Sequence, residues 1–408
     1  MPTGPDALVE KLLAHCRRKP GMQETLNYNT REPAFNILGG FLDEFAHFYL
    51  GKATDVLMLR CSDSERERLA TQSGSISVSD RMKWDTTGWT WTDVALDGTI
   101  PEETLLSLID QSYQLVLDSD RIDDDDKHQI ALIGRQLQQP EILNDLISWY
   151  DLPHRKKEIQ QVSQTAALLK TCEMEESQMP IGQTKIGGLP DLPMGSHWPT
   201  HRSGKPLAFL AQINFSQVRE VVRLDDLPDT GMLHIFSAYG WQNEDSLDPQ
   251  LPNESSQAGW TQIQFDPNAD TPLQRHDRPA GVNGFKAAAV QIIPTISLPD
   301  AKEPAMTALK WNEGEIEVFD WKLKYSFKKV RDYLLGQPAN HLLLGYADYE
   351  QEFVDLVSQH NLRLLFQLAS DNNAGMCWGD SGLIYFWIKP EDLRRRDFSN
   401  VFVDYQCG

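Results

Sequence analysis

The chain has few cysteines and none of the patterns that would make them structural. Its 408 residues contain five cysteines, an odd number, with no CxxC pair. Small secreted proteins and zinc ribbons depend on paired or closely spaced cysteines. The cysteine pattern therefore argues against both classes, and it favours a reducing compartment.

Long apolar runs are also missing. No run approaches the roughly 18 residues that a membrane-spanning helix needs. The N-terminus lacks the charged region and the apolar region of a secretory signal. We therefore expect a cytoplasmic protein.

Positive charge is scarce relative to negative charge. The chain has 38 Lys and Arg against 59 Asp and Glu, which gives a net charge of −21 at pH 7. Acidic residues are in excess on both sides of residue 160. This negative field repels phosphate backbones and disfavours sequence-independent nucleic-acid binding, whereas it suits a basic protein partner.

The composition is otherwise that of a folded protein. A hydrophobic content of 40% and eleven tryptophans are sufficient for packed cores. A chain of this length favours more than one domain. We predict an α+β protein with an N-terminal domain (1–120) of helices on an antiparallel sheet, a helical connector (121–176) and a C-terminal α+β domain (177–408).

The N-terminal domain has a family resemblance. Residues 96–116 contain a turn at Asp97-Gly98, a proline-led helix start and IDQSYQLV, after a strand in which Trp89, Trp91 and Asp93 alternate. With an early KPG, this pattern resembles the MmcQ/YjbR-like family over about residues 5–118. The resemblance implies helices on one face of an antiparallel sheet, and some family members have been proposed to bind DNA.

Charge in this domain does not match a phosphate-binding face. Residues 1–118 hold 11 basic and 18 acidic side chains, and only Arg17, Arg18 and Lys19 cluster. Phosphate binding needs several clustered cations. We interpret the three as the solvated C-terminal end of a helix, where positive charge is favourable.

The connector begins with an acidic run. Asp123, Asp124, Asp125 and Asp126 lack the DxDxDG spacing of a calcium loop, so we interpret them as a solvated helix N-terminus. A second helix follows Pro140. We predict a third helix over about residues 156–175.

The C-terminal domain carries the strongest resemblance. Several motifs occur in order, among them KIGGLPDLP, HWPT, GKPLAFLAQINF, HLLLGYADYEQE, LLFQLASD, WGDSGLIYFWI and the closing YQC. Over about residues 175–408 the chain therefore resembles the YwqG-like family. That resemblance implies a cytoplasmic α+β fold without established catalytic activity, and frequent encoding near bacterial polymorphic toxins.

The same domain shows an internal duplication. The strands PLAFLAQINF (206–215) and RLLFQLAS (363–370) each place one glutamine inside an apolar run, and a glycine-led strand follows each. Gln212 and Gln367 are then equivalent positions in two strand pairs related by a pseudo-two-fold axis. Each amide must find a partner or cost about 1–3 kcal/mol. They either brace the irregular Gly/Pro-rich arm (179–206) or line a shared polar pocket.

No coherent catalytic set emerges. The string GDSG (379–382) matches a protease nucleophile motif, but no base or orienting group accompanies it. We interpret it as a turn in which Asp380 caps backbone amides and Gly379 and Gly382 allow positive φ. His197 and His201 flank Pro199, which opposes a helical metal site. Trp378 is a binding anchor if exposed and a seal for the corner if buried.

These observations favour a non-catalytic binding protein, without metal or cofactor. The leading hypothesis is an immunity protein that covers the active site of a basic toxin domain, in contact with Asp123–Asp126 and exposed aromatics such as Trp89 and Trp91. The second hypothesis is a small-ligand or enzymatic domain with a pocket lined by Gln212, Gln367 and Asp380. The third is nucleic-acid binding through the N-terminal domain.

Overall fold

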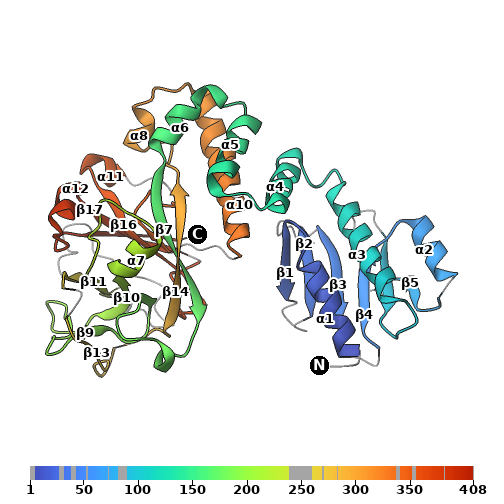
Figure 1. Cartoon of the computed structure of the whole chain (residues 1–408), viewed down its shortest axis with the longest axis horizontal. Helices are drawn as coiled ribbons and strands as arrows, with labels where there is room; N and C mark the ends of the chain where they lie inside the picture. Colours follow the sequence, from blue (N-terminus) through green and yellow to red (C-terminus); the bar gives the residue numbers. More distant parts are fainter. Residues whose placement is uncertain are drawn as a thin grey trace. The chain divides into compact units, whose positions relative to one another are not determined.

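The described chain forms two compact units (Figure 1). One comprises Met1–Gln138 with Lys328–Leu334, and the other comprises Gln139–Phe327 with Leu335–Gly408. Both units combine helices with antiparallel sheet, as the sequence predicts. The computed structural model describes residues 5–26, 32–37, 43–51, 54–71, 73–80, 90–238, 260–268, 271–282, 284–336, 341–351, 355–380 and 382–407.

The first unit is built on a six-stranded antiparallel sheet in the order β1-β2-β3-β4-β6-β5. One face of the sheet packs against helices α1 and α3, and the predicted stripe of α3 (Leu105, Leu108, Ile109 and Tyr113) is buried there. The strands are β1 (Met22–Leu26), β2 (Pro33–Ile37), β3 (Glu44–Tyr49), β4 (Val56–Arg60), β5 (Ile76–Val78) and β6 (Trp91–Ala95).

The helices of this unit follow local signals in the sequence. Ser62 caps α2 by accepting the Glu65 amide N–H at 3.2 Å, and Asp123 caps α4 in the same way. The helices are α1 (Pro5–Cys16), α2 (Asp63–Ala70), α3 (Glu102–Leu117), α4 (Asp124–Arg135) and the last part of α10 (Tyr325–Leu334).

The second unit is built on a ten-stranded sheet whose order is symmetric. The order is β12-β11-β10-β8-β14-β7-β15-β16-β17-β18, and the pairings are antiparallel. The strands are β7 (Gln164–Glu173), β8 (Lys185–Ile186), β10 (Ala208–Asn214), β11 (Met232–Ser237), β12 (Thr261–Asp266), β14 (Ala288–Ser297), β15 (Leu342–Leu343), β16 (Arg363–Ala369), β17 (Leu383–Ile388) and β18 (Phe402–Gln406). Strands β9 (Asp191–Pro193) and β13 (Leu273–Arg275) form a separate pair.

The symmetry confirms the predicted duplication and extends it to five strands in each half. The long strands β7 and β14 run side by side at the centre (Figure 1), paired over ten residues. Each long strand also pairs with the short second strand of the other half, β7 with β15 and β14 with β8. The halves are therefore interlocked, because the long strand of each half is paired with strands of the other half and not with its own.

One predicted element is wrong. Helix α6 ends at Val162, and the remainder of the predicted third helix is strand β7. Its residues 166–169 are fully buried between two neighbouring strands. A short apolar run that is buried on both faces has no amphipathic period, so the sequence pattern alone does not separate a strand from a helix.

The large sheet is strongly curved. Phe265 lies on edge strand β12, and Phe398 lies in the connection that leads from α12 (Pro390–Arg395) to the opposite edge strand β18, yet their ring centroids are 5.1 Å apart. Side chains from both halves therefore share one core.

Helices cover this unit and fill the connections between its strands. Within the described residues, none has the length and apolar character needed to cross a membrane. They are α5 (Gln139–Trp149), η1 (Pro153–Arg155), α6 (Lys156–Val162), η2 (Glu176–Gln178), α7 (Phe215–Val221), α8 (Pro304–Thr307), α9 (Glu313–Glu317), η5 (Val318–Lys324), the start of α10, α11 (Asp355–Gln359) and α12 (Pro390–Arg395).

Candidate functional site

The two predicted glutamines make the same hydrogen bond in the two halves. The Oε1 atom of Gln212 accepts the Asp191 amide N–H at 2.8 Å, and that of Gln367 accepts the Asp348 amide N–H at 2.9 Å. Both glutamines are fully buried. We call residues 185–191 with Gln212 the first elbow, and residues 342–348 with Gln367 the second elbow.

The backbone of the elbows repeats as well. The Gly187 N–H donates to the Leu210 carbonyl at 2.8 Å, and the Leu344 N–H donates to the Leu365 carbonyl at 3.1 Å. In both halves this carbonyl belongs to the residue at which the strand register shifts. The duplication therefore includes the β-bulge, which bends a strand.

Each elbow turns through two consecutive residues with positive φ, a conformation that favours glycine. The pairs are Gly187 and Gly188 in the first elbow and Leu344 and Gly345 in the second. A β-carbon on Gly188 would lie 2.6 Å from the Ala287 Cβ, and one on Gly345 would lie 2.9 Å from the Ala166 Cβ. Neither glycine can be replaced without moving the neighbouring long strand or its flank.

The halves diverge at the side chain that closes each elbow from the next strand. His234 on β11 donates from Nε2 to the Asp191 carbonyl at 2.8 Å. The equivalent Tyr385 on β17 donates its hydroxyl to the Asp348 carbonyl at 2.9 Å. Burial lowers the pKa of His234 to about 4, so the ring is neutral near pH 7.

The first elbow also holds a buried charged network. The fully buried Lys185 Nζ lies 3.1 Å from Glu176 Oε1 and 3.5 Å from Asp191 Oδ2, and Arg275 Nε donates to Asp191 Oδ1 at 2.9 Å. Burial acts against ionisation of Asp191, but Arg275 and Lys185 outweigh it and lower its pKa. Burial lowers the pKa of Lys185 despite its two acidic neighbours.

The polar groups of this network make their hydrogen bonds to one another and to the arm. Gln212 Nε2 donates to the Gln183 carbonyl at 2.7 Å and to Asp191 Oδ2 at 2.9 Å, so its amide holds the Gly/Pro-rich arm. For Gln212 this geometry matches the bracing interpretation, whereas Gln367 holds the Asp348 N–H of the second elbow and not the arm. Because both side chains have no solvent exposure, they contribute no surface to a pocket open to solvent.

A buried histidine–aspartate pair lies in the second half. His341 Nδ1 accepts the Ala369 N–H at 3.0 Å, so Nε2 carries the proton and donates to Asp371 Oδ2 at 2.8 Å. Burial opposes ionisation of Asp371, but the bonds from His341 and Thr171 lower its pKa to about 2. Among the described residues, no group of three or more His, Cys, Asp or Glu side chains is placed to hold a metal.

A small cavity opens where the arm meets strands β10 and β11. It has a volume of about 240 Å³ and contains both apolar and polar side chains. Its lining residues are Ile181, Gly182, Asn214, Ser216, Gly231, Met232, Asp266, Asn268, Thr271 and Leu273.

The GDSG corner seals the end of β16. Trp378 is buried at 1% exposure, and its indole N–H donates to the Ala369 carbonyl at 3.0 Å. Asp380 is exposed, and Ser381 lies outside the described residues. Gly379 has φ of +61°, as predicted. Gly382 does not have a positive φ, and it is needed because a β-carbon there would lie 2.3 Å from the Trp378 carbonyl.

Among the residues that the structure describes, the most exposed large aromatic side chains lie elsewhere, on η5 and the start of α10. Trp321 is 76% exposed and Tyr325 is 60% exposed, and Trp149 on α5 is 44% exposed. Helices α5 and α10 lie side by side (Figure 1), and the Tyr150 hydroxyl is 2.7 Å from Ser326 Oγ. We call Trp149, Trp321 and Tyr325 the aromatic surface.

The sequence contained a signal for this surface that was missed. Phe319, Leu323 and Phe327 recur every four residues and are buried. Trp321 and Tyr325 lie two residues out of phase with that stripe, which places them on the opposite face of the helix. η5 is a π-helix, a rare conformation that occurs frequently at functional sites.

Half-buried charges connect η5 to the segment that precedes α8. Lys324 lies 2.6 Å from Asp320 and 3.3 Å from Asp300. Glu303 is 7% exposed, and burial followed by the charge of Asp300 raises its pKa to about 7. The Glu303 carboxyl group therefore has a pKa near neutral pH, and it interacts with Asp300, which pairs with Lys324 on η5.

A family model settles the class of the second unit. The model DUF1963, described as a domain of unknown function, matches residues 184–407, which is more than half of the chain. The chain belongs to this family. DUF1963 is the domain of the YwqG-like proteins, so that resemblance is confirmed.

Other comparisons add little. The crystal structure of Deinococcus radiodurans protein DR2400, with the family-model domain DUF419, is 23% identical. The match covers 30% of this chain and 87% of that chain, with a TM-score of 0.26. No curated protein matches the chain.

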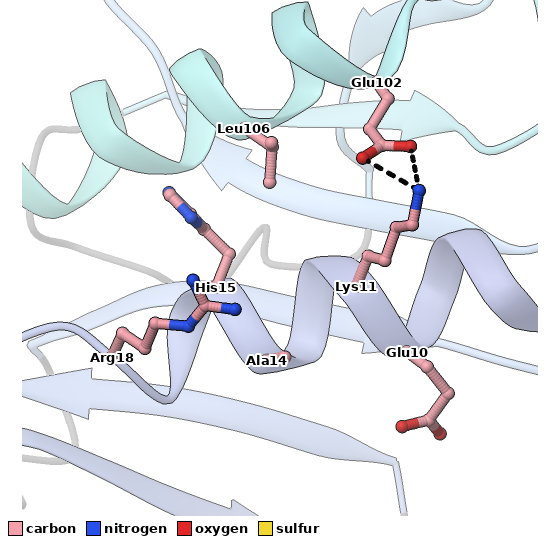
Figure 2. A pocket seen from close by; sticks show the side chains of 7 residues that line it. All are labelled: Glu10, Lys11, Ala14, His15, Arg18, Glu102 and Leu106. Atoms are coloured by element: carbon pink, nitrogen blue, oxygen red, sulfur yellow. Dashed lines mark hydrogen bonds and ion pairs between the residues drawn. The ribbon is translucent and has the colours of Figure 1, made fainter.

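Outside the DUF1963 domain, the cations of the first unit are largely paired. One pocket of this unit has a volume of about 450 Å³. Lys11 pairs with Glu102 at its edge, at 2.8 Å (Figure 2). The pocket is lined by Glu10, Lys11, Ala14, His15, Arg18, Glu102 and Leu106.

The cluster Arg17, Arg18 and Lys19 is similarly engaged. Arg17 pairs with Glu24 at 2.8 Å, and Lys19 and His15 both pair with Asp110. Within the described part of the chain, Arg18 has no ion pair. The cluster therefore offers one uncompensated cation.

Trp91 is not the exposed anchor that the sequence suggested. It is 3% exposed because Arg60, its cross-strand partner, covers the ring with its guanidinium at 4.3 Å. Trp89 lies outside the described residues.

The acidic run forms a helix N-terminus, as predicted. Asp123 Oδ1 accepts the Asp126 N–H at 2.8 Å, and Asp126 pairs with Lys329 at 2.9 Å. Asp123 and Asp124 are exposed, whereas Asp125 and Asp126 are half-buried.

Replacing Gln212 with Leu should destabilise the DUF1963 domain. The change leaves the Asp191 N–H and the Gln183 carbonyl buried without their partner, at about 1–3 kcal/mol for each buried group. We expect a lower urea midpoint with an unchanged slope. Gln161→Leu, at an exposed position on α6, is the control and should change stability by less than about 0.5 kcal/mol. Equal midpoints for both variants would contradict the bracing role.

The raised pKa of Glu303 predicts a pH dependence of stability. The folded state binds the proton more tightly than the unfolded state, so this contribution is present below pH 4.5 and is lost as the pH rises to about 7. Glu303→Gln should abolish the loss and raise stability at pH 8 by on the order of 2–3 kcal/mol. Urea unfolding of both proteins from pH 4 to pH 8 measures it, and parallel curves would refute the assignment.

Proposed function

We propose that this protein is a cytoplasmic, non-catalytic binding protein of the immunity type, which neutralises a basic toxin domain by covering that domain's active site. The observation that carries the proposal is the aromatic surface, in which Trp321 is 76% exposed on a π-helix beside Tyr325. Exposed aromatic side chains of this size are unusual unless a partner covers them.

Aromatic anchors supply most of the energy in many protein interfaces. Tryptophan and tyrosine are enriched among the residues whose truncation costs at least 2 kcal/mol. The buried stripe of Phe319, Leu323 and Phe327 fixes the helix, so Trp321 is presented from a rigid support. A preformed anchor loses little conformational entropy on binding.

Charge complements this surface. Glu313 and Glu317 precede Trp321 and are exposed, and among the described residues neither has a pairing cation. With a net charge of −21, the protein should capture a basic partner quickly. The exposed Asp123 and Asp124 remain candidate contacts of the same kind.

A second candidate function is binding of a small polar ligand. The cavity of about 240 Å³ beside the Gly/Pro-rich arm supports it, because its lining contains Ser216, Asp266 and Thr271. This ligand site differs from the pocket that the sequence suggested, since Gln212 and Gln367 are fully buried.

We also propose that the first unit is an MmcQ/YjbR-like domain. The support is the LDG turn, the PEE helix start and the IDQSYQLV segment on a helix packed against an antiparallel sheet. Nucleic-acid binding through this unit finds little support, because acidic partners hold most of the clustered cations.

The aromatic surface should be required for partner binding. Purified protein is immobilised and incubated with extract of the native host, and bound proteins are identified by mass spectrometry. We expect a basic protein to be retained, and Trp321→Ala with Tyr325→Ala to weaken its measured affinity at least about thirtyfold, which corresponds to 2 kcal/mol.

Met194→Ala is the matched control, because Met194 is 72% exposed but lies on the Gly/Pro-rich arm. The control should retain the partner, and it should protect cells that express the partner, whereas the double variant should not. Retention of no basic protein by the wild type would defeat the proposal, and equal binding by both variants would remove the aromatic surface from it.

A further inference from the structure

The GDSG corner brings two of the five cysteines to one glycine. The Cys377 thiol donates to the Gly379 carbonyl at 3.2 Å. A β-carbon on Gly379 would lie 3.1 Å from the Cys407 Sγ. Although they are thirty residues apart in the sequence, the two sulfur atoms therefore both lie next to Gly379.

The pairing of the last two strands determines this arrangement. Leu383 on β17 pairs with Gln406 on β18, so Cys407 comes beside Gly382, where a β-carbon would lie 2.9 Å from its Cβ. The Tyr405 hydroxyl hydrogen-bonds to Cys407 and occupies the space that a Gly379 side chain would need. Cys407 can therefore pack against the corner only because Gly379 and Gly382 have no side chain.

The other cysteines lack these properties. Cys16 and Cys61 are buried, and burial raises the pKa of both thiols, which opposes formation of the reactive thiolate. Cys172 is exposed, and its thiol points to the Ala289 carbonyl at 3.6 Å. Cys377 is exposed and Cys407 is half-buried, so solvent reaches the pair.

We propose that Cys377 and Cys407 form a reversible modification site, a dithiol that hydrogen peroxide oxidises to a disulfide. This inference is independent of the proposed function. The Cys377 thiolate attacks one peroxide oxygen, the O–O bond breaks, and a sulfenic acid and one water form. The Cys407 thiolate then attacks the sulfenic sulfur, the S–O bond breaks, and the disulfide forms with release of a second water. The two sulfurs lose two electrons, which the peroxide gains.

The disulfide joins the corner covalently to the last strand of the sheet. In the reduced form, the corner and that strand are in contact by packing of Gly379 and Gly382 against residues 405–407. The disulfide therefore restricts movement of the GDSG corner relative to the edge strand β18. Thiol reductants restore the dithiol.

The experiment treats the reduced full-length protein with one equivalent of hydrogen peroxide, blocks remaining thiols, and maps peptides by mass spectrometry. A peptide pair linked through Cys377 and Cys407 is expected, with titratable thiols falling from five to three and returning to five with dithiothreitol. A sulfinic acid at Cys377, a disulfide between chains, or unmodified peptides would each overturn the proposal.

Variants sharpen the result. Cys172→Ser, which removes an exposed thiol elsewhere in the same unit, should still lose two thiols. Cys377→Ser and Cys407→Ser should each lose none to a disulfide. Loss of two thiols to a disulfide in Cys377→Ser would assign the chemistry to other cysteines and overturn the proposal.

Discussion

The hydrogen bond from a backbone amide to a buried glutamine is the contact on which the second unit depends. In each half, the turn after a two-residue strand passes through two left-handed residues and would leave an aspartate amide unpaired in the core. Gln212 and Gln367 satisfy that amide from the neighbouring strand. Without this partner, the chain could not turn inside a sheet buried on both faces.

The two halves satisfy the same geometric demand with different chemistry. The first elbow uses Lys185 and His234, whereas the second uses Leu342 and Tyr385 at equivalent positions. A charged core needs several partners, which Glu176, Asp191 and Arg275 provide. An apolar residue at the Lys185 position needs none. Divergence within a shared backbone shows that topology, rather than a particular polar set, is the common requirement.

The sequence revealed this topology because glutamine is conspicuous inside an apolar strand. Two such strands, each followed by a glycine-led strand, were sufficient to predict equivalent positions for Gln212 and Gln367. The interlocking of β7 and β14 was not predictable, since no local pattern states which half a central strand will join. The burial of Trp91 was missed for a similar reason: its cover is Arg60, a distant residue that reads as solvent-exposed.

The aromatic surface was not predicted because the helical positions of Trp321 and Tyr325 were not compared with those of the apolar stripe beside them. The sequence prediction made no statement about Trp321, although its position relative to Phe319 and Leu323 places it outside the core. Trp378, by contrast, had two stated outcomes, and the bond from its indole N–H to Ala369 identifies it as the seal of the corner. Side-chain phase is thus more informative than residue type when a sequence is rich in tryptophan.

The connections between equivalent strands show where the halves acquired separate roles. Between β7 and β8 the chain needs only residues 174–184, the beginning of the arm that borders the small cavity. Between β14 and β15 the equivalent connection spans residues 298–341 and contains α8, α9, η5 and α10. Because the duplicated sheet does not require this insertion, its exposed Trp321 is not explained by the stability of the sheet. Binding residues are often concentrated in such connections on a rigid scaffold, which is why we propose this insertion as the part that recognises a partner.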